Sequence, residues 1–244
     1  MRALEARDML GLWDACAALH PIDRTLAMLC AGSPDESLEA LASLPIGERE
    51  RRAVALRVTT FGALAEGVDE CPACGVSHEV VPPLRAILES ASAVTEPVRL
   101  SSRGYELLIR VPDSRDQASI THQSGVAAAR AELLERCVIE ASRAGEPVAA
   151  GELPAEVVAE VADALAARDG NAETLITLTC TGCGELWTIV FDAGEFLWRE
   201  VVIRARRLLR EIDVLARTYH WSEAEVLTMS AQRREAYLDL VGPG

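Results

Sequence analysis

The chain has 244 residues, half of them hydrophobic, and a formal net charge of −14. This length and composition suffice for one large domain or two small ones with a hydrophobic core. The acidic balance argues against broad binding to nucleic acids or to anionic membrane surfaces, because both require basic footprints on the protein.

The first seventy residues are predicted to be helical. Residues 5–30 carry an apolar pattern with helical spacing, which Pro21 interrupts. Residues 44–47 predict a turn, and residues 48–61 predict an amphipathic helix with apolar side chains among charged ones. We therefore assign residues 1–70 to an N-terminal helical region.

Residues 71–192 are predicted to form a β core with inserted helices. Two C-x-x-C-G motifs, called knuckles here, each lead into a strand-like segment, at residues 79–81 and 187–191. A further strand at 175–179 enters the second knuckle. Helical patterns fill residues 117–171, with an interruption at Gly125. The other predicted elements are strands at 98–100 and 105–111 and helices at 126–142 and 154–168.

Residues 193–244 are predicted to be a C-terminal helical region. A long amphipathic helix covers residues 196–217, and its arginines form either a solvated face or a basic docking strip. The sequence from Ser222 to Glu225 is a capping box that starts a short helix at 223–228, and Ser230 can cap a last helix through Leu240. The arginines of the long helix are Arg204, Arg206, Arg207 and Arg210.

The two knuckles predict one metal site. Four thiolates in two such pairs complete a tetrahedral zinc shell, and a shell of four sulfurs leaves no open position, so the zinc would be structural. Two redox or disulfide pairs and four unrelated buried cysteines are the alternatives. His78 is a possible substitute ligand, although an exposed or hydrogen-bonded histidine is the simpler interpretation. The ligands expected are Cys71, Cys74, Cys180 and Cys183.

The predicted fold class is therefore α+β: mainly helical, with a small antiparallel zinc-ribbon β core built from two distant knuckles. Cys16, Cys30 and Cys137 stand alone in apolar helical contexts and are expected to be small core residues. This use of cysteine suits a reducing cytoplasm. The charged N-terminal start predicts no signal peptide, and no apolar run is long enough to span a bilayer.

An enzyme is not expected. The four histidines form no ligand array, and the chain has no P-loop, no dinucleotide-binding glycine motif and no nucleophile elbow. The acidic residues lie on helical surfaces without an isolated pair suited to general acid–base chemistry. We therefore predict no catalytic residues and no small-molecule substrate.

The C-terminal segment resembles a known family. The stretch from Phe196 through Tyr219, Trp221 and the capping box to Tyr237 is similar to the baseplate hub assembly proteins, or assembly chaperones, of T-even-phage type. The N-terminal pattern around residues 12–24 and 44–47, and the segment 105–116, look like a zinc-ribbon-bearing bacterial branch of that family, associated with contractile phage tails and contractile injection systems.

The resemblance implies a non-enzymatic assembly factor, or a minor structural component, of a contractile tail or injection-system baseplate. Its partners would be baseplate, tube or spike proteins, and it would lie in the cytoplasm or within the assembled tail-like particle. For the aromatic candidates, packing within the helical turn is the alternative to partner contact. The candidate partner residues are Tyr219, Trp221, Arg233, Arg234 and Tyr237.

Two other functions are alternatives on the sequence alone. A zinc-ribbon regulator that binds nucleic acid would use the C-terminal helices as a helix-turn-helix, although acidic charge opposes it and the last helix balances Arg233 and Arg234 with Glu235 and Asp239. A metallohydrolase would require an open metal position, which ligation by all four knuckle cysteines excludes.

Overall fold

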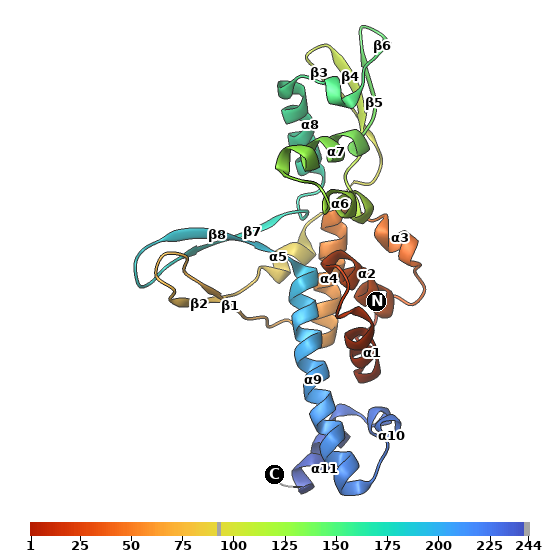
Figure 1. Cartoon of the computed structure of the whole chain (residues 1–244), viewed down its shortest axis with the longest axis vertical. Coiled ribbons are helices and arrows are strands. Elements are labelled where there is room, and N and C mark those ends of the chain that lie inside the picture. Colours follow the sequence, from red (N-terminus) through yellow and green to blue (C-terminus); the bar gives the residue numbers. More distant parts are fainter. Residues whose placement is uncertain (92–93, 242–244) are drawn as a thin grey trace.

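A computed structural model describes residues 1–91 and 94–241 of the chain. The fold is mixed α and β, mainly helical with small antiparallel sheets, as predicted. The chain forms a four-stranded sheet and two β-hairpins. The molecule is elongated, with the four-stranded sheet at one end, α10 (Glu223–Thr228) and α11 (Ala231–Val241) at the other and the hairpins projecting sideways (Figure 1). Residues 92–93 and 242–244, which belong to the predicted β core and C-terminal regions, lie outside the described residues.

The helical body packs around one long helix, α9. The predicted break at Pro21 is confirmed: His20 accepts a hydrogen bond from Ile22 N, and Pro21 occupies the first helical turn. Helix α9 buries Leu197 and Leu208 completely against the N-terminal helices. The helices of this body are α1 (Ala6–Cys16), α2 (Pro21–Gly32), α3 (Leu38–Ala42), α4 (Ile46–Phe61) and α9 (Ala193–Tyr219).

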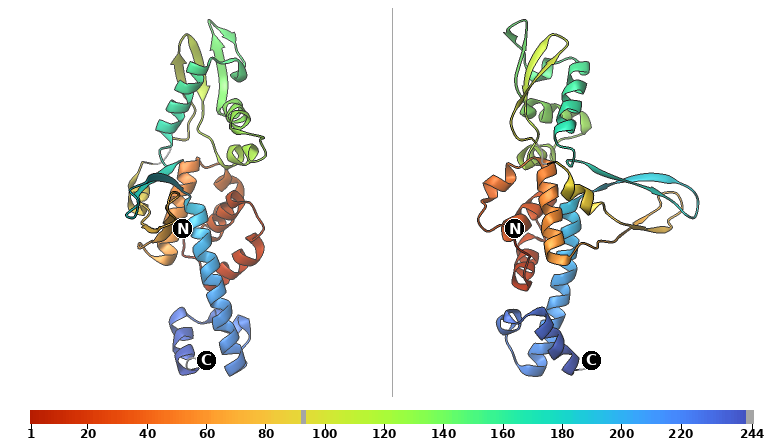
Figure 2. Two further views of the ribbon diagram at one scale, coloured as in Figure 1. Left: turned by 60° about the vertical axis from the view of Figure 1, so that its left-hand side comes forward. Right: turned by 180° about the vertical axis from the view of Figure 1, so that it is seen from behind.

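Helix α9 continues beyond this body to the C-terminal helices, and both views of Figure 2 show it as the column that connects them. Helix α10 (Glu223–Thr228) starts where predicted, because Ser222 and Glu225 form the expected capping box. The hydroxyl of Ser230 accepts a hydrogen bond from Arg233 N at the start of α11 (Ala231–Val241). The sequence thus predicted both helix starts through their caps.

The sheet end of the molecule has a hydrophobic core of its own. Tyr105, Leu107 and Ile109 on β4 pack against Val157 and Val161 on α8. The sheet order is β3-β4-β5-β6, all antiparallel. Its elements are β3 (Val98–Ser102), β4 (Tyr105–Ile109), α6 (Ser114–Ile120), α7 (Val126–Cys137), β5 (Val138–Arg143), β6 (Glu146–Pro147), a 3₁₀ turn (Ala150–Glu152) and α8 (Ala155–Arg168).

The helix predicted at 126–142 is wrong beyond Cys137. The chain leaves helix α7 there and enters β5, whose residue Ala141 pairs with Leu107 of β4. Two β-branched residues, Val138 and Ile139, begin the strand, and Val138 is buried in the sheet core. The pairing with β4 therefore overrides a helical pattern that runs on in the sequence.

The two knuckles belong to two separate hairpins. The first hairpin pairs β1 (Gly67–Glu70) with β2 (Ser77–Val80), and the second pairs β7 (Thr174–Thr179) with β8 (Leu186–Phe191). Strand β1 was not predicted, so the N-terminal helical region ends before residue 70. The short helix α5 (Leu84–Glu89) was not predicted either.

The predicted β core of residues 71–192 is therefore three antiparallel sheets and not one. The two hairpins and the four-stranded sheet share no strand pairing among the described residues. The inserted segment forms the sheet end of the molecule, and its helices begin at Ser114, slightly before the predicted position. Among the described residues no helix is both long and apolar enough to cross a membrane.

Candidate metal centre

Each knuckle forms the tip of a hairpin, with the same backbone hydrogen bonds in both. Cys71 N donates to Val76 O at 3.0 Å, and Cys180 N donates to Glu185 O at 2.8 Å. The glycine after each second cysteine donates back to the first cysteine, over 2.9 Å in one tip and 3.0 Å in the other. Gly75 and Gly184 have φ angles of +73° and +80°, a left-handed conformation that favours glycine.

The two tips meet and bring four sulfurs together. The four Sγ atoms lie within 4.8 Å of one another. Cys71 Sγ lies 3.7 Å from Cys183 Sγ, and Cys74 Sγ lies 3.5 Å from Cys180 Sγ. A tetrahedral shell with metal–sulfur bonds of about 2.3 Å has sulfur–sulfur edges of about 3.8 Å. These separations are too long for disulfides, and all four cysteines are free.

The donor set therefore fits a four-coordinate metal ion. The site is half open to solvent: Cys71 and Cys180 are buried, whereas Cys74 and Cys183 are exposed. In the described part of the chain this is the one group of histidine, cysteine or acidic side chains close enough to hold a metal. All four predicted metal residues are thus brought to one point, as the sequence predicted.

The backbone of the second knuckle stabilises the thiolate form of Cys180. Backbone N–H groups of Cys183 and Gly182 donate to Cys180 Sγ over 3.4 and 3.3 Å, and lower the pKa of this thiol to about 5. A backbone hydrogen bond at Glu185 lowers the pKa of Cys183, but contacts with the neighbouring thiols outweigh it and raise that pKa to about 12. Four sulfurs this close cannot all ionise without a cation, so metal binding would release protons.

His78 is a hydrogen-bonded neighbour of the site. Its Nε2 lies 3.3 Å from Cys180 Sγ, and its ring packs edge-on against Trp187, with centroids 5.4 Å apart. Trp187 in turn donates from Nε1 to Asp69 Oδ2 over 2.7 Å, which links β8 to β1. The contacts of Trp187 with His78 and Asp69 therefore join the two hairpins in addition to the four cysteines. No pattern in the sequence marks the contact between Trp187 and Asp69.

The predicted aromatic partner residues form one cluster at the end of α9. Tyr219 and Trp221 stack with ring centroids 4.6 Å apart, and Tyr237 packs edge-on against both, at 5.5 and 4.8 Å. All three rings are half-buried against the helical core. They thus hold α11 against the end of α9 and keep part of their surface accessible.

The two predicted arginines differ in their surroundings. Arg233 is exposed, and its guanidinium carbon lies 5.7 Å from the Tyr237 ring centre. Arg234 is only 3% exposed and pairs with the buried Glu211 at 3.2 Å. The expectation that Arg234 lies on a partner surface is therefore wrong, because its guanidinium is used inside the molecule.

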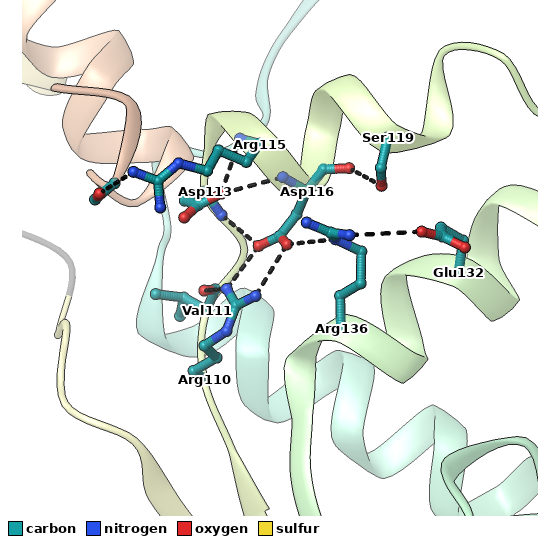
Figure 3. A network of polar contacts seen from close by, with 9 residues as sticks. Arg110, Val111, Asp113, Arg115, Asp116, Ser119, Glu132 and Arg136 are labelled. Atoms are coloured by element: carbon teal, nitrogen blue, oxygen red, sulfur yellow. Dashed lines mark hydrogen bonds and ion pairs between the residues drawn. The ribbon is translucent and has the colours of Figure 1, made fainter. Parts of the chain in front are cut away.

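Two of the buried carboxylates form arginine networks and were not singled out from the sequence. Asp116 is fully buried and accepts hydrogen bonds from Arg110, Arg136 and Asp113 N (Figure 3). Asp113 and Asp116 have the spacing of a capping box, which is the signal that could have revealed the local part of this network. Glu211 is the second carboxylate. The signal that could have revealed it in the sequence is an acidic residue on the apolar face of α9.

Comparisons with protein-family models, with curated proteins and with solved structures find no match to this chain. The described residues form a mainly helical protein with small antiparallel sheets, in which two hairpin tips bring together four cysteines able to hold a metal ion.

Proposed function

We propose that Cys71, Cys74, Cys180 and Cys183 bind one structural Zn²⁺, which makes the paired hairpins a split zinc ribbon. The observation that supports this most directly is the set of sulfur separations, which match the edges of a tetrahedral thiolate shell. Four protein ligands leave no coordination position for a substrate. The metal would therefore supply folding energy and not catalysis.

The construction of the hairpins supports a structural role for the metal. Each hairpin has only two strands, and isolated two-stranded hairpins are marginally stable in water. Their outer faces are solvent-exposed, with Val68, Leu175 and Val190 among the exposed apolar residues. A metal at the tips closes the end of each hairpin that lies farthest from the helical body (Figure 1).

We propose further that the protein is a non-enzymatic assembly factor or minor structural adaptor of a contractile tail or injection-system baseplate. This proposal rests on the resemblance of the C-terminal segment to baseplate hub assembly proteins. It is supported by the way that segment folds: Tyr219, Trp221 and Tyr237 gather into one partly accessible cluster, with Arg233 exposed beside it. Baseplate, tube or spike proteins would be the partners.

The alternative of a zinc-ribbon regulator that binds nucleic acid has less support. A recognition helix requires exposed basic or amide side chains along one face. Arg234 of α11 is buried against Glu211, which leaves Arg233 as the only exposed arginine of that helix, among the acidic Glu235 and Asp239. The overall charge of −14 opposes phosphate binding as well.

The proposed function is tested by capture from the native host. The chain would carry an N-terminal tag, because the aromatic cluster involves α11, which lies next to the C-terminus (Figure 1). We expect tube, spike or baseplate proteins to co-purify with the wild type, and fewer of them with a variant that combines Tyr237→Ala and Arg233→Ala. Recovery of nucleic acid, or of no structural protein, would contradict the proposal. The matched control is Arg99→Ala, on the exposed side of the distant sheet.

A further inference from the structure

Helix α9 has an outward face on which two aliphatic residues lie among five arginines. Residues spaced three and four apart lie on one side of a helix, so this face forms a continuous line about 27 Å long at 1.5 Å per residue. We call it the α9 stripe. Its members are Arg199, Ile203, Arg206, Arg207, Arg210, Val214 and Arg217.

The α9 stripe is open to solvent. The side chains of Arg199 and Arg217 are 73% and 80% exposed, and Ile203 is 69% exposed. The opposite side of the same helix is fully buried at Val201 and Leu215. Among the described residues no element covers the stripe, so α9 is a core helix on one side and an unpartnered surface on the other.

The stripe concentrates positive charge on an acidic protein. Arg199, Arg207 and Arg217 each pair with an acidic residue one helical turn away, at 3.4, 3.1 and 2.9 Å. Arg206 and Arg210 form no ion pair within residues 1–91 and 94–241. Two arginines without acidic partners on a chain of net charge −14 create a local field that attracts carboxylates.

The aliphatic residues distinguish the stripe from an ordinary solvated face. Ile203 and Val214 lie between the arginines, where solubility alone would favour polar side chains. Arginine next to desolvated apolar groups is typical of protein interfaces, and lysine is depleted there. The chain has no lysine at all, so the aliphatic neighbours, and not the choice of arginine, set the stripe apart. The stripe thus offers charge and apolar contact together.

These features select one kind of occupant. A second copy packed stripe to stripe would place arginines opposite arginines, and such like-charge contacts are repulsive. A nucleic-acid backbone would pair with Arg206 and Arg210 but leave Ile203 and Val214 without apolar contact. An amphipathic helix with one acidic and one aliphatic row satisfies both kinds of residue.

We infer that the α9 stripe docks an acidic amphipathic helix of a partner protein. Carboxylates of the partner pair with Arg206 and Arg210, and its aliphatic side chains pack on Ile203 and Val214. The inference deepens the proposed function and rests on it for its biological setting, since it names the chemistry of one partner surface. Binding itself is measurable with the purified chain alone.

The experiment uses fluorescence anisotropy with the full chain and three labelled probes: a synthetic helix with one row of glutamates and one of leucines, poly-L-glutamate, and duplex DNA. The test variant combines Arg206→Glu and Arg210→Glu. The control combines Arg99→Glu and Arg130→Glu, which changes the net charge equally at two exposed arginines of the sheet end. A third variant, Ile203→Ser, removes the aliphatic contact.

We expect the amphipathic helix to bind the wild type, and the test variant to weaken it by about tenfold or more, because two charge pairs become repulsive. The control should change binding by less than about twofold, since exposed charges far from a contact are screened. Ile203→Ser should weaken binding of the leucine-bearing helix and leave poly-L-glutamate binding unchanged. Circular dichroism and metal content should be the same for all variants.

Several results would overturn the inference. Equal losses of helix affinity in the test and control variants would show that binding depends on net charge alone. Tighter binding of DNA than of the helix would show that the stripe binds nucleic acid. A wild-type dimer that the test variant abolishes would show that the stripe binds a second copy of the chain. Absence of binding to every probe would also refute it. Capture of baseplate proteins that survives the test variant would refute the stripe and leave the proposed function standing.

Discussion

Trp187 Nε1 on β8 donates a 2.7 Å hydrogen bond to Asp69 Oδ2 on β1, although the two residues belong to hairpins far apart in the sequence. The same indole ring packs against His78 of β2. Both contacts lie beside the sulfurs and need no metal. The hairpins are therefore oriented toward each other by side chains as well as by the four cysteines.

Trp187→Phe should loosen the tips without removing a sulfur. The substitution keeps an aromatic ring beside His78 and deletes the donor to Asp69, so we expect a loss of about 1 kcal/mol in the stability of the paired tips. The measurement is the rate of metal release to a chromogenic chelator, which should rise several-fold, in line with the general effect of such supporting contacts. Asp69→Asn keeps an acceptor oxygen and should release metal almost as slowly as the wild type. An unchanged rate in Trp187→Phe would show that the hydrogen bond does not support the site.

Cys180→Ser should abolish stoichiometric metal binding, because the shell loses a buried ligand whose thiol pKa is lowered. The helical body should persist, since its core around α9 contains no residue of the knuckles. Metal content and far-ultraviolet circular dichroism test the two statements together. The matched control is Cys30→Ser, a half-buried cysteine of α2. Equal metal loss in the control, or complete unfolding of Cys180→Ser, would contradict the assignment.

Asp116→Asn should destabilise the sheet end of the molecule. Burial disfavours the charged carboxylate, but hydrogen bonds from Arg110, Asp113 N and Arg136 outweigh this and lower its pKa to about 2. A carboxylate whose pKa falls from its usual 3.8 to about 2 stabilises the folded state by about 2 kcal/mol at neutral pH. Urea unfolding should show a loss of that size or greater, because the two guanidinium groups also lose their anion.

The pH dependence of this loss has a definite sign. The folded-state pKa of Asp116 is lowered, so its contribution is complete above about pH 4 and disappears as the pH falls toward 2. The stability difference between wild type and Asp116→Asn should therefore shrink below pH 4. Taking the difference cancels the acid release of metal, which both proteins share. Asp239→Asn, at an exposed position of α11, should show no such trend. A difference that stays constant with pH would contradict ionisation of Asp116 as the cause.

Arg233→Ala and Arg234→Ala should affect different properties of the protein. Arg234→Ala removes the ion pair with Glu211 and the hydrogen bond to Met229 O, so we expect a loss of about 1–3 kcal/mol in the free energy of unfolding. Arg233→Ala lies on the surface and should change that free energy by less than about 0.5 kcal/mol, while weakening partner capture. Urea titration and co-purification separate the two. Equal stability of both variants would contradict the buried role of Arg234.

Local signals in the sequence account for the parts that were predicted. The capping box at Ser222 determined the first residue of α10, and the knuckles with Gly75 and Gly184 gave the hairpin tips, because caps and tight turns depend on a few neighbouring residues. Convergence of the four cysteines could be predicted despite the long separation, since a single tetrahedral shell needs four ligands.

Pairing between distant segments explains what was missed. Strand β1 has one apolar residue, Val68, and that residue is exposed, so no alternating pattern marks it. It is a strand because β2 pairs with it. The helical sequence pattern of α7 continues into β5. The chain nevertheless becomes a strand at Val138, because this segment pairs with β4. The burial of Asp116 and Arg234 depends on the assembled fold, since surface and interior arginine–carboxylate pairs look the same in a sequence.

The metal site is tested most directly by X-ray absorption at the zinc edge, with metal quantification, on the full chain purified from cells supplied with zinc. A structural thiolate site predicts one zinc per chain with four sulfur ligands at about 2.3 Å. A shell that contains nitrogen or oxygen, or a protein purified without bound zinc, would contradict a structural thiolate site formed by Cys71, Cys74, Cys180 and Cys183.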